Sequence, residues 1–294
     1  MVAPLEGYAA AFAAGLLFAV SDVLVRLGAR TLQPLQLLLA SLVFGTPLLF
    51  AAAAASGEPL PSGRVLAYYV LAGLLNFVVG RLLFYYAVAG AGAATASIAT
   101  SPTVLFSALL AWLILGEPLD PRVAVGLVLV FLGVLLASVE PSGRPLHGVG
   151  SRLAVAAGMA SSLVFASTSI IVRAAGVEGG SPAWGVAVSY ASALPVVAAY
   201  SLRRLGARRL LPLGDPGIRY AAGAAVAVAV AQLSRYVSLH LLPVAYAVIL
   251  ISLFPVHTVV LASLVSGEAR ERVGARHLAG ALTAFSGIAV ALGL

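Results

Sequence analysis

The chain contains no cysteine and no lysine, and it has few charged residues of either sign. The absence of cysteine excludes disulfide bridges and thiolate metal sites. Only 9% of the 294 residues are charged, whereas 62% are hydrophobic, which leaves too little polar surface to cover a water-soluble domain. The composition therefore predicts a protein whose solvent is a lipid bilayer.

All 17 basic residues are arginine, and the formal net charge is +7. In a soluble protein this charge would suggest nucleic acid as a partner. Here the arginines lie mostly at the ends of apolar stretches, where anionic lipid head groups account for them. We therefore expect the bilayer, and not nucleic acid, to be the partner of these side chains.

Ten stretches are long and apolar enough to cross the hydrocarbon as helices, which takes about 20 residues each. Transmembrane β-strands would alternate apolar and polar residues, and the run 123–139 does not. The sequence thus predicts an all-α polytopic membrane protein with ten transmembrane helices, at roughly 7–28, 34–55, 65–89, 91–115, 121–139, 151–175, 183–202, 217–241, 243–266 and 277–294.

The two halves of the chain carry the same pattern. The line FAVSDVLVR at 18–26 returns as FASTSIIVR at 165–173, 147 residues later and half the chain length apart. An odd number of spans in each copy gives the copies opposite orientations in the membrane. We therefore predict two inverted five-helix repeats, 1–139 and 151–294, joined by a connector at 140–150. Further matched positions are Arg81 with Arg235, Pro102 with Pro255, Glu117 with Glu268, Gly133 with Gly287, Ser41 with Ser189 and Pro47 with Pro195.

Three short motifs recur in order in both halves. They are Phe-Ala-x-Ser/Thr near the end of the first helix, a proline in the fourth helix, and Gly-Glu at the close of that helix, at 116–117 and 267–268. Together they resemble the EamA-type permeases of the drug/metabolite transporter superfamily, over nearly the whole chain. The resemblance implies a multi-pass protein of the cell membrane that exports or takes up small metabolites or amino acids through a cavity between the repeats.

The orientation in the membrane stays open at this stage. The resemblance implies that both termini lie in the cytoplasm. Twelve arginines lie in connections after odd-numbered helices and three after even-numbered ones, so the positive-inside rule places both termini outside.

The expected function is secondary active transport of a small polar metabolite, such as an amino acid or an organic anion, by alternating access between the repeats. The alternatives are an intramembrane enzyme and a non-transporting receptor or structural protein. A metal-dependent membrane enzyme needs clustered acids or histidines, and the four histidines are scattered along the chain. We therefore expect no enzyme activity, no metal and no cofactor, with a small-molecule substrate as partner and a monomer or homodimer as the assembly.

Three charged residues, Asp22, Arg81 and Arg235, lie well inside the expected spans. A charge at bilayer depth costs about 2.5 to 3.5 kcal/mol on insertion scales, so each should face a cavity or a partner. Asp22 and Arg81 lie at similar depth. An ion pair of Asp22 with Arg81 or Arg26 would only neutralise charge, whereas an Asp22 that exchanges a proton or cation would couple transport to a gradient.

Arg235 is a candidate for binding an anionic group of the substrate, because Ser169 occupies the position that matches Asp22 and no obvious carboxylate balances the guanidinium. Pairing with backbone carbonyls, with lipid phosphate or with an acid elsewhere is the alternative. Arg81, Asn76, Gln232 and Ser169 are further candidate substrate contacts. His257 is a candidate proton relay or a packed histidine, and Pro102 and Pro255 are expected to kink their helices.

Overall fold

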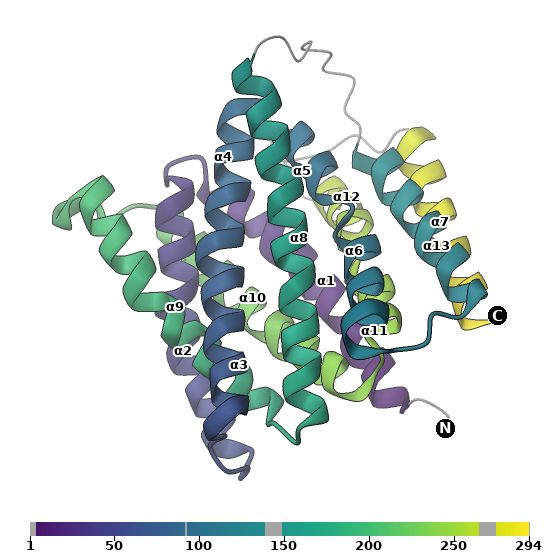
Figure 1. Cartoon of the computed structure of the whole chain (residues 1–294). Helices are drawn as coiled ribbons and strands as arrows, with labels where there is room; N and C mark the ends of the chain where they lie inside the picture. The colour runs from purple at the N-terminus through teal and green to yellow at the C-terminus, as the bar shows by residue number, and fades with distance from the viewer. Residues whose placement is uncertain (1–3, 92, 139–148, 265–274, 294) are drawn as a thin grey trace.

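The computed structural model describes residues 4–91, 93–138, 149–264 and 275–293, and nearly all of these residues are helical. No strand occurs among them (Figure 1). The elements are α1 (Leu5–Gly28), α2 (Pro34–Ala55), α3 (Gly63–Gly73), η1 (Leu74–Gly80), α4 (Arg81–Ala91), α5 (Ala93–Thr100), α6 (Thr103–Leu110), η2 (Ala111–Leu115), α7 (Pro121–Ser138), α8 (Val149–Val177), α9 (Pro182–Leu205), η3 (Ala207–Arg209), α10 (Gly217–Leu241), α11 (Val244–Ile251), α12 (Phe254–Leu264) and α13 (Ala275–Leu292).

Within the described residues, seven helical segments are long and apolar enough to cross a membrane, and three shorter apolar helices accompany them, at 121–136, 244–258 and 278–292. The prediction of an all-helical, multi-pass membrane protein is therefore confirmed. The exact number of ten spans stays a prediction. Residues 140–148 of the predicted connector and the Gly267-Glu268 motif lie outside the described residues.

Three of the expected helices are interrupted. The segment expected at 65–89 contains η1, a π-helical stretch between Gly73 and Gly80. The segments expected at 91–115 and 243–266 are each broken, just before Thr103 and Phe254. Pro102 stands at the break between α5 and α6, and Pro255 is the second residue of α12. Proline lacks the N–H that would continue the preceding helical ladder, which accounts for both positions.

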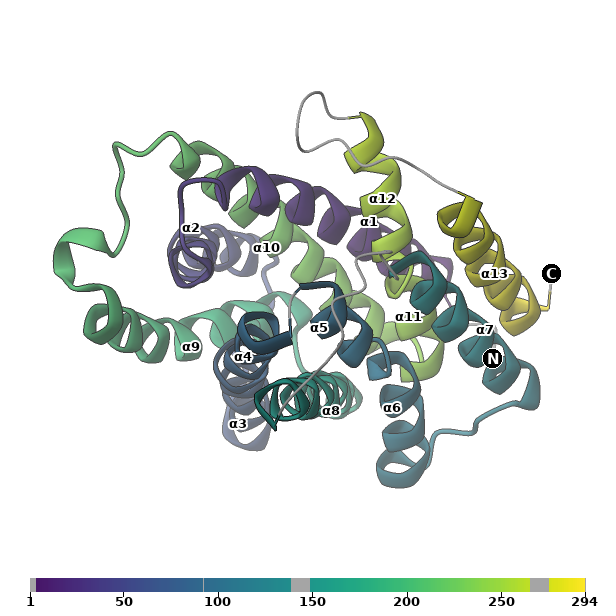
Figure 2. The ribbon, with the colours of Figure 1, turned by 90° about the horizontal axis from the view of Figure 1, so that it is seen from above.

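Helices α7 and α13 pack side by side at one edge of the bundle (Figure 2). A Cβ atom on Gly126 would lie 2.5 Å from the carbonyl oxygen of Gly287, and one on Gly133 would lie 2.6 Å from that of Gly280. The two helices are therefore antiparallel and in backbone contact. Because Gly133 matches Gly287 in the duplicated sequence, and Gly126 matches Gly280 at the same offset, exchanging the halves converts one contact into the other.

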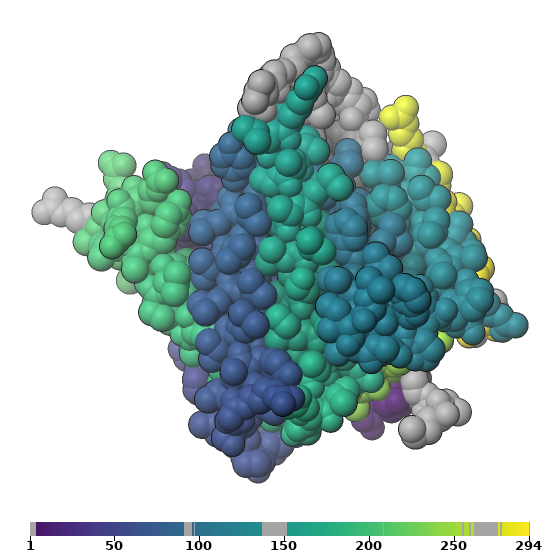
Figure 3. Space-filling model, in the orientation of Figure 1, coloured from purple at the N-terminus to yellow at the C-terminus, as the bar shows by residue number. Residues whose placement is uncertain are grey.

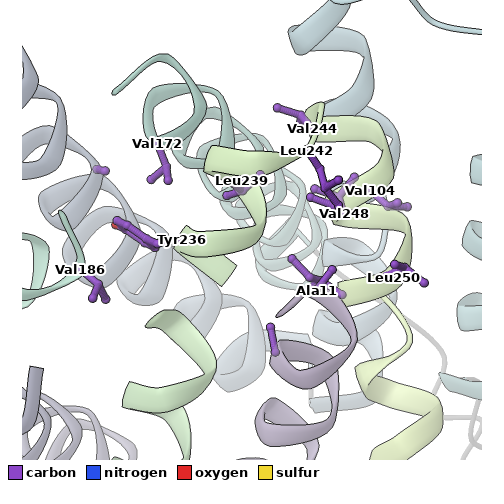
Figure 4. Close-up of a cluster of buried hydrophobic side chains, with 14 of the residues drawn as sticks. Ala11, Val104, Val172, Val186, Tyr236, Leu239, Leu242, Val244, Val248 and Leu250 are labelled. Carbon is purple, nitrogen blue, oxygen red and sulfur yellow. The ribbon is translucent and has the colours of Figure 1, made fainter. Parts of the chain in front are cut away.

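The contacts of α1 and α8 are also related by exchange of the two halves. Helix α1 packs on α10 and α12, and its counterpart α8 packs on the α3–α4 segment and on α6. In the space-filling view α8 fills the seam between α3–α4 and α6 (Figure 3). The main apolar core lies where the end of α10, the start of α11, α1 and α8 meet, around Leu239, Leu242 and Val172 (Figure 4).

Candidate functional site

The Arg235 guanidinium is buried and is held by neutral side chains. It lies on α10 with 9% of its surface exposed. Its Nη2 donates hydrogen bonds to the hydroxyl oxygens of Ser169 at 2.8 Å and Thr168 at 3.1 Å, both on α8, and its Nη1 donates to Gln232 Oε1 at 3.4 Å. Among the described residues it forms no ion pair with a carboxylate. The fold thus brings Arg235, Ser169 and Gln232 together while leaving the positive charge uncompensated.

A hydrogen-bond relay next to Arg235 links the two halves. The Ser189 hydroxyl, on α9, donates to the Tyr69 carbonyl at 2.7 Å and lies 2.8 Å from the Tyr236 hydroxyl. The Tyr69 ring is stacked on the His240 ring at 6.3 Å. The sequence assigns neither tyrosine to a site, because an aromatic residue in an apolar helix is equally typical of the core and of an interfacial anchor.

Arg81 is the charged group of the interior that has no hydrogen bond or ion pair with any described residue. It is the first residue of α4, and its guanidinium lies over the Phe165 ring at 5.9 Å. Its buried Nε has no partner. Phe165 lies one helical turn before Thr168 on α8, so Arg81 and Arg235 flank the same stretch of that helix.

Asp22 lies within electrostatic reach of Arg81 but is not in contact with it. The carboxylate lies within the fields of Arg81 and Arg26 and near the Thr258 hydroxyl of α12, which donates a hydrogen bond to the Phe254 carbonyl at 2.8 Å. No Asp22–Arg81 ion pair forms within 4.0 Å among the described residues. Of the two arginines expected as neutralising partners of Asp22, Arg81 is therefore not in direct contact with it.

Asp22 and Tyr85 are both half-buried. The charge of Arg81 also reaches the hydroxyls of Tyr85 and Tyr190, and the buried Tyr190 hydroxyl has no partner among the described residues. The described residues thus include the Arg81 guanidinium without an ion pair, the Asp22 carboxylate not in contact with it, and the Tyr190 hydroxyl without a hydrogen bond.

The remaining candidates lie apart from this group. His257, on α12, meets the edge of Phe12 at 5.3 Å and interacts with the Gly15 carbonyl, so it belongs to the contact between α12 and α1. Asn76 is buried in η1, and its side chain has no hydrogen-bond partner among the described residues. The Pro255 side chain lies outside the described residues, although its backbone is part of α12.

An ion pair that the sequence did not predict lies at one end of the bundle. Glu117 Oε1 accepts a hydrogen bond from Arg173 Nε at 2.7 Å, and the two side chains are 14% and 16% exposed. A signal was present in the sequence, because Arg26 matches Arg173 and Glu268 matches Glu117. The sequence does not show that the matched arginine and glutamate meet, because they lie on different helices far apart in the chain.

Comparison with solved structures shows the same fold elsewhere. A crystal structure described only as "Crystal structure of protein" superposes with a TM-score of 0.81, at 16% sequence identity, over 97% of this chain and 96% of the other. At that identity the likeness concerns the fold alone. No curated protein matches the sequence significantly.

The family is defined by sequence. The profile of the EamA-like transporter family matches twice, at residues 5–139 and again at 152–293, and the two matches cover almost all of the chain. Each match takes in one of the two halves whose motifs recur. The chain therefore belongs to the EamA-like transporter family.

Proposed function

We propose that this protein is a secondary active permease of the cell membrane, which moves a small polar metabolite with an anionic group by alternating access between two inverted repeats. The observation that carries the proposal is the free Arg81 guanidinium inside the bundle. A charged group at that depth is costly and is retained where it serves a transport pathway or a ligand.

The charges around Arg81 suggest the roles of the individual residues. The Arg81 guanidinium can hold a carboxylate or phosphate through two parallel hydrogen bonds. Arg235 adds a second positive charge, which is held at Thr168 and Ser169, about one helical turn further along α8. Asp22 is the carboxylate available to exchange a proton or cation, or to meet a cationic group of the solute. An organic anion or an amino acid fits this arrangement, and membership of a transporter family supports transport over catalysis.

The antiparallel contact of α7 with α13 supports the inverted arrangement. Equivalent helices that run in opposite directions are what two repeats of opposite orientation produce. The free side chains at Arg81 and Tyr190 then lie between the repeats, where substrates bind in transporters of this architecture.

The experiment is a thermal-shift screen followed by flux. Amino acids, organic anions and sugar phosphates are tested for stabilisation of the purified protein, since a ligand present at 100 times its Kd adds about 2.7 kcal/mol. The stabilising solute is then followed in counterflow between liposomes. Arg81→Gln should weaken binding about tenfold or more, whereas Arg204→Gln, at the exposed end of α9, should leave it unchanged.

Asp22→Asn separates coupling from binding. The variant should keep solute exchange in counterflow and lose accumulation driven by a proton or ion gradient, because exchange needs no net ion movement. Full gradient-driven accumulation in Asp22→Asn would remove Asp22 from the coupling role. Failure of every solute class to stabilise the protein or to move would overturn the transport function.

A further inference from the structure

The Glu117–Arg173 pair joins four chain segments at one end of the bundle. Glu117 is the second residue after η2. The residue between them, Gly116, turns the chain with φ of 66°. The second oxygen of Glu117, Oε2, accepts a hydrogen bond from the backbone N–H of Val244 at 2.7 Å, at the first residue of α11. Arg173 Nη1 donates to the carbonyls of His240 at 2.7 Å and Leu239 at 3.3 Å, at the end of α10.

The pair ties one half of the chain to the other. Glu117 belongs to the first half, whereas Arg173, the end of α10 and the start of α11 belong to the second. The ion pair therefore satisfies the helix ends on both sides of the α10–α11 turn, whose last carbonyls and first N–H groups have no partner within a helix. In Figure 1 these segments meet at the lower end of the bundle, where α8 ends and α11 begins.

The same end is closed by further contacts between the halves. The Tyr69 hydroxyl of the first half lies 3.3 Å from His240 Nε2 of the second half. Within the second half, a Cβ on Gly176 would come within 2.7 Å of the His240 ring. Arg64 pairs with Glu178 at 3.0 Å, but their side chains are 72% and 34% exposed. Glu117–Arg173 is thus the sheltered one of the two ion pairs among the described residues, and both link the halves.

We propose that Glu117 and Arg173 form a lock that holds this end of the bundle shut, and that the pair separates when the same end opens during transport. The second part rests on the alternating access proposed above. When the pair separates, both charged groups, the N–H of Val244 and two carbonyls of α10 lose their hydrogen-bond partners. All of these groups must then be hydrated. The lock therefore favours the closed state of this end, and water entering as the end opens stabilises the separated charges.

The absence of cysteine makes the lock testable by site-specific labelling. Ser238, on α10, is fully buried and its hydroxyl has no partner among the described residues, so Ser238→Cys is a mild reporter. It lies three residues beyond Arg235 toward the lock, and therefore near the same face of α10. Leu60→Cys, exposed at the lock end, and Ala207→Cys, exposed at the other end, report the side from which an impermeant maleimide arrives.

In the Ser238→Cys background, Glu117→Gln and Arg173→Gln should each speed labelling from the Leu60 side about tenfold, equivalent to a 1.4 kcal/mol shift toward the open end. Arg64→Gln is the matched control, because it breaks the exposed ion pair of the same end, and it should leave the rate unchanged. If the charge variants do not fold, Val244→Pro removes one hydrogen bond of the lock at a position where proline is tolerated, and it should still speed labelling.

Parental labelling rates in folded Glu117→Gln and Arg173→Gln would overturn the lock. Equal acceleration by Arg64→Gln would also overturn it, because any loss of contact at this end would then suffice. Labelling needs no substrate, so the two proposals fail separately. Unchanged labelling with intact solute flux overturns the lock alone, whereas faster labelling without flux of any solute upholds closure by the pair and overturns the transport function.

Discussion

Substituting alanine for glycine should have opposite effects on stability at two positions of this bundle. Gly223 lies in α10, where a new Cβ would meet only the flexible end of Leu24 at 3.4 Å. Gly287 lies in α13, where a new Cβ would lie 2.6 Å from the backbone oxygen of Gly126 and 2.9 Å from the Leu129 Cβ. The chemical change is the same, so the difference between the two variants isolates the contact between α7 and α13.

The magnitude follows from two opposing effects. Alanine is favoured over glycine in a helix interior by about 0.8 to 1.0 kcal/mol, and Gly223→Ala should gain most of this. At Gly287, reaching an ordinary contact of about 3.5 Å requires the two backbones to separate by about 0.9 Å, which forfeits dispersion energy along the interface. Overpacking of this kind costs about 1 to 3 kcal/mol, so Gly287→Ala should lose about 1 kcal/mol net.

The assay is reversible unfolding in mixed detergent micelles, followed by far-UV circular dichroism. The two variants should differ by about 2 kcal/mol, or roughly 30-fold in the unfolding equilibrium constant. Equal changes in the free energy of unfolding would show that α7 and α13 are not in backbone contact, and would refute the antiparallel packing derived from the glycines.

Three further variants test the polar interior by the same unfolding measurement. Glu117→Leu leaves Arg173 without its carboxylate and should lower the free energy of unfolding by about 3 to 5 kcal/mol. The control Arg64→Gln should cause no measurable change. If Glu117→Leu also causes none, the Glu117–Arg173 pair is well hydrated. Ser189→Ala deprives the Tyr69 carbonyl and the Tyr236 hydroxyl of a partner and should cost about 1 to 3 kcal/mol, and a neutral result would show that water replaces the hydroxyl. Arg235→Met removes a buried charge with no counter-charge and should raise stability by about 1 kcal/mol; a large loss would reveal an acidic partner.

Helix boundaries were predictable because hydropathy along the chain is a local property. The spans expected at 34–55, 151–175 and 217–241 agree with α2, α8 and α10 to within two residues at each end. The π-helical stretch η1 was not predictable, since residues 74–80 contain no proline and their apolar run is interrupted only by Asn76. The glycines at its two ends contact residues that are distant in the sequence. Gly73, just before η1, lies against the Ser189 backbone, and Gly80, its last residue, lies against the Phe165 ring.

The sequence alone determined the solvent, the duplication and the family, and it predicted the depth of the charged residues, because composition, internal repetition and distance from a helix end can be read along one chain. Only the tertiary structure decided which partners those charges have. Arg81 and Asp22 lie at similar depth but do not touch, Arg235 is held by Ser169 and Thr168, and Arg173 reaches Glu117 across the halves. Depth is fixed by position along a helix, whereas contact also depends on how each helix is rotated and which helix packs against it, and both are set by the packing of the whole bundle.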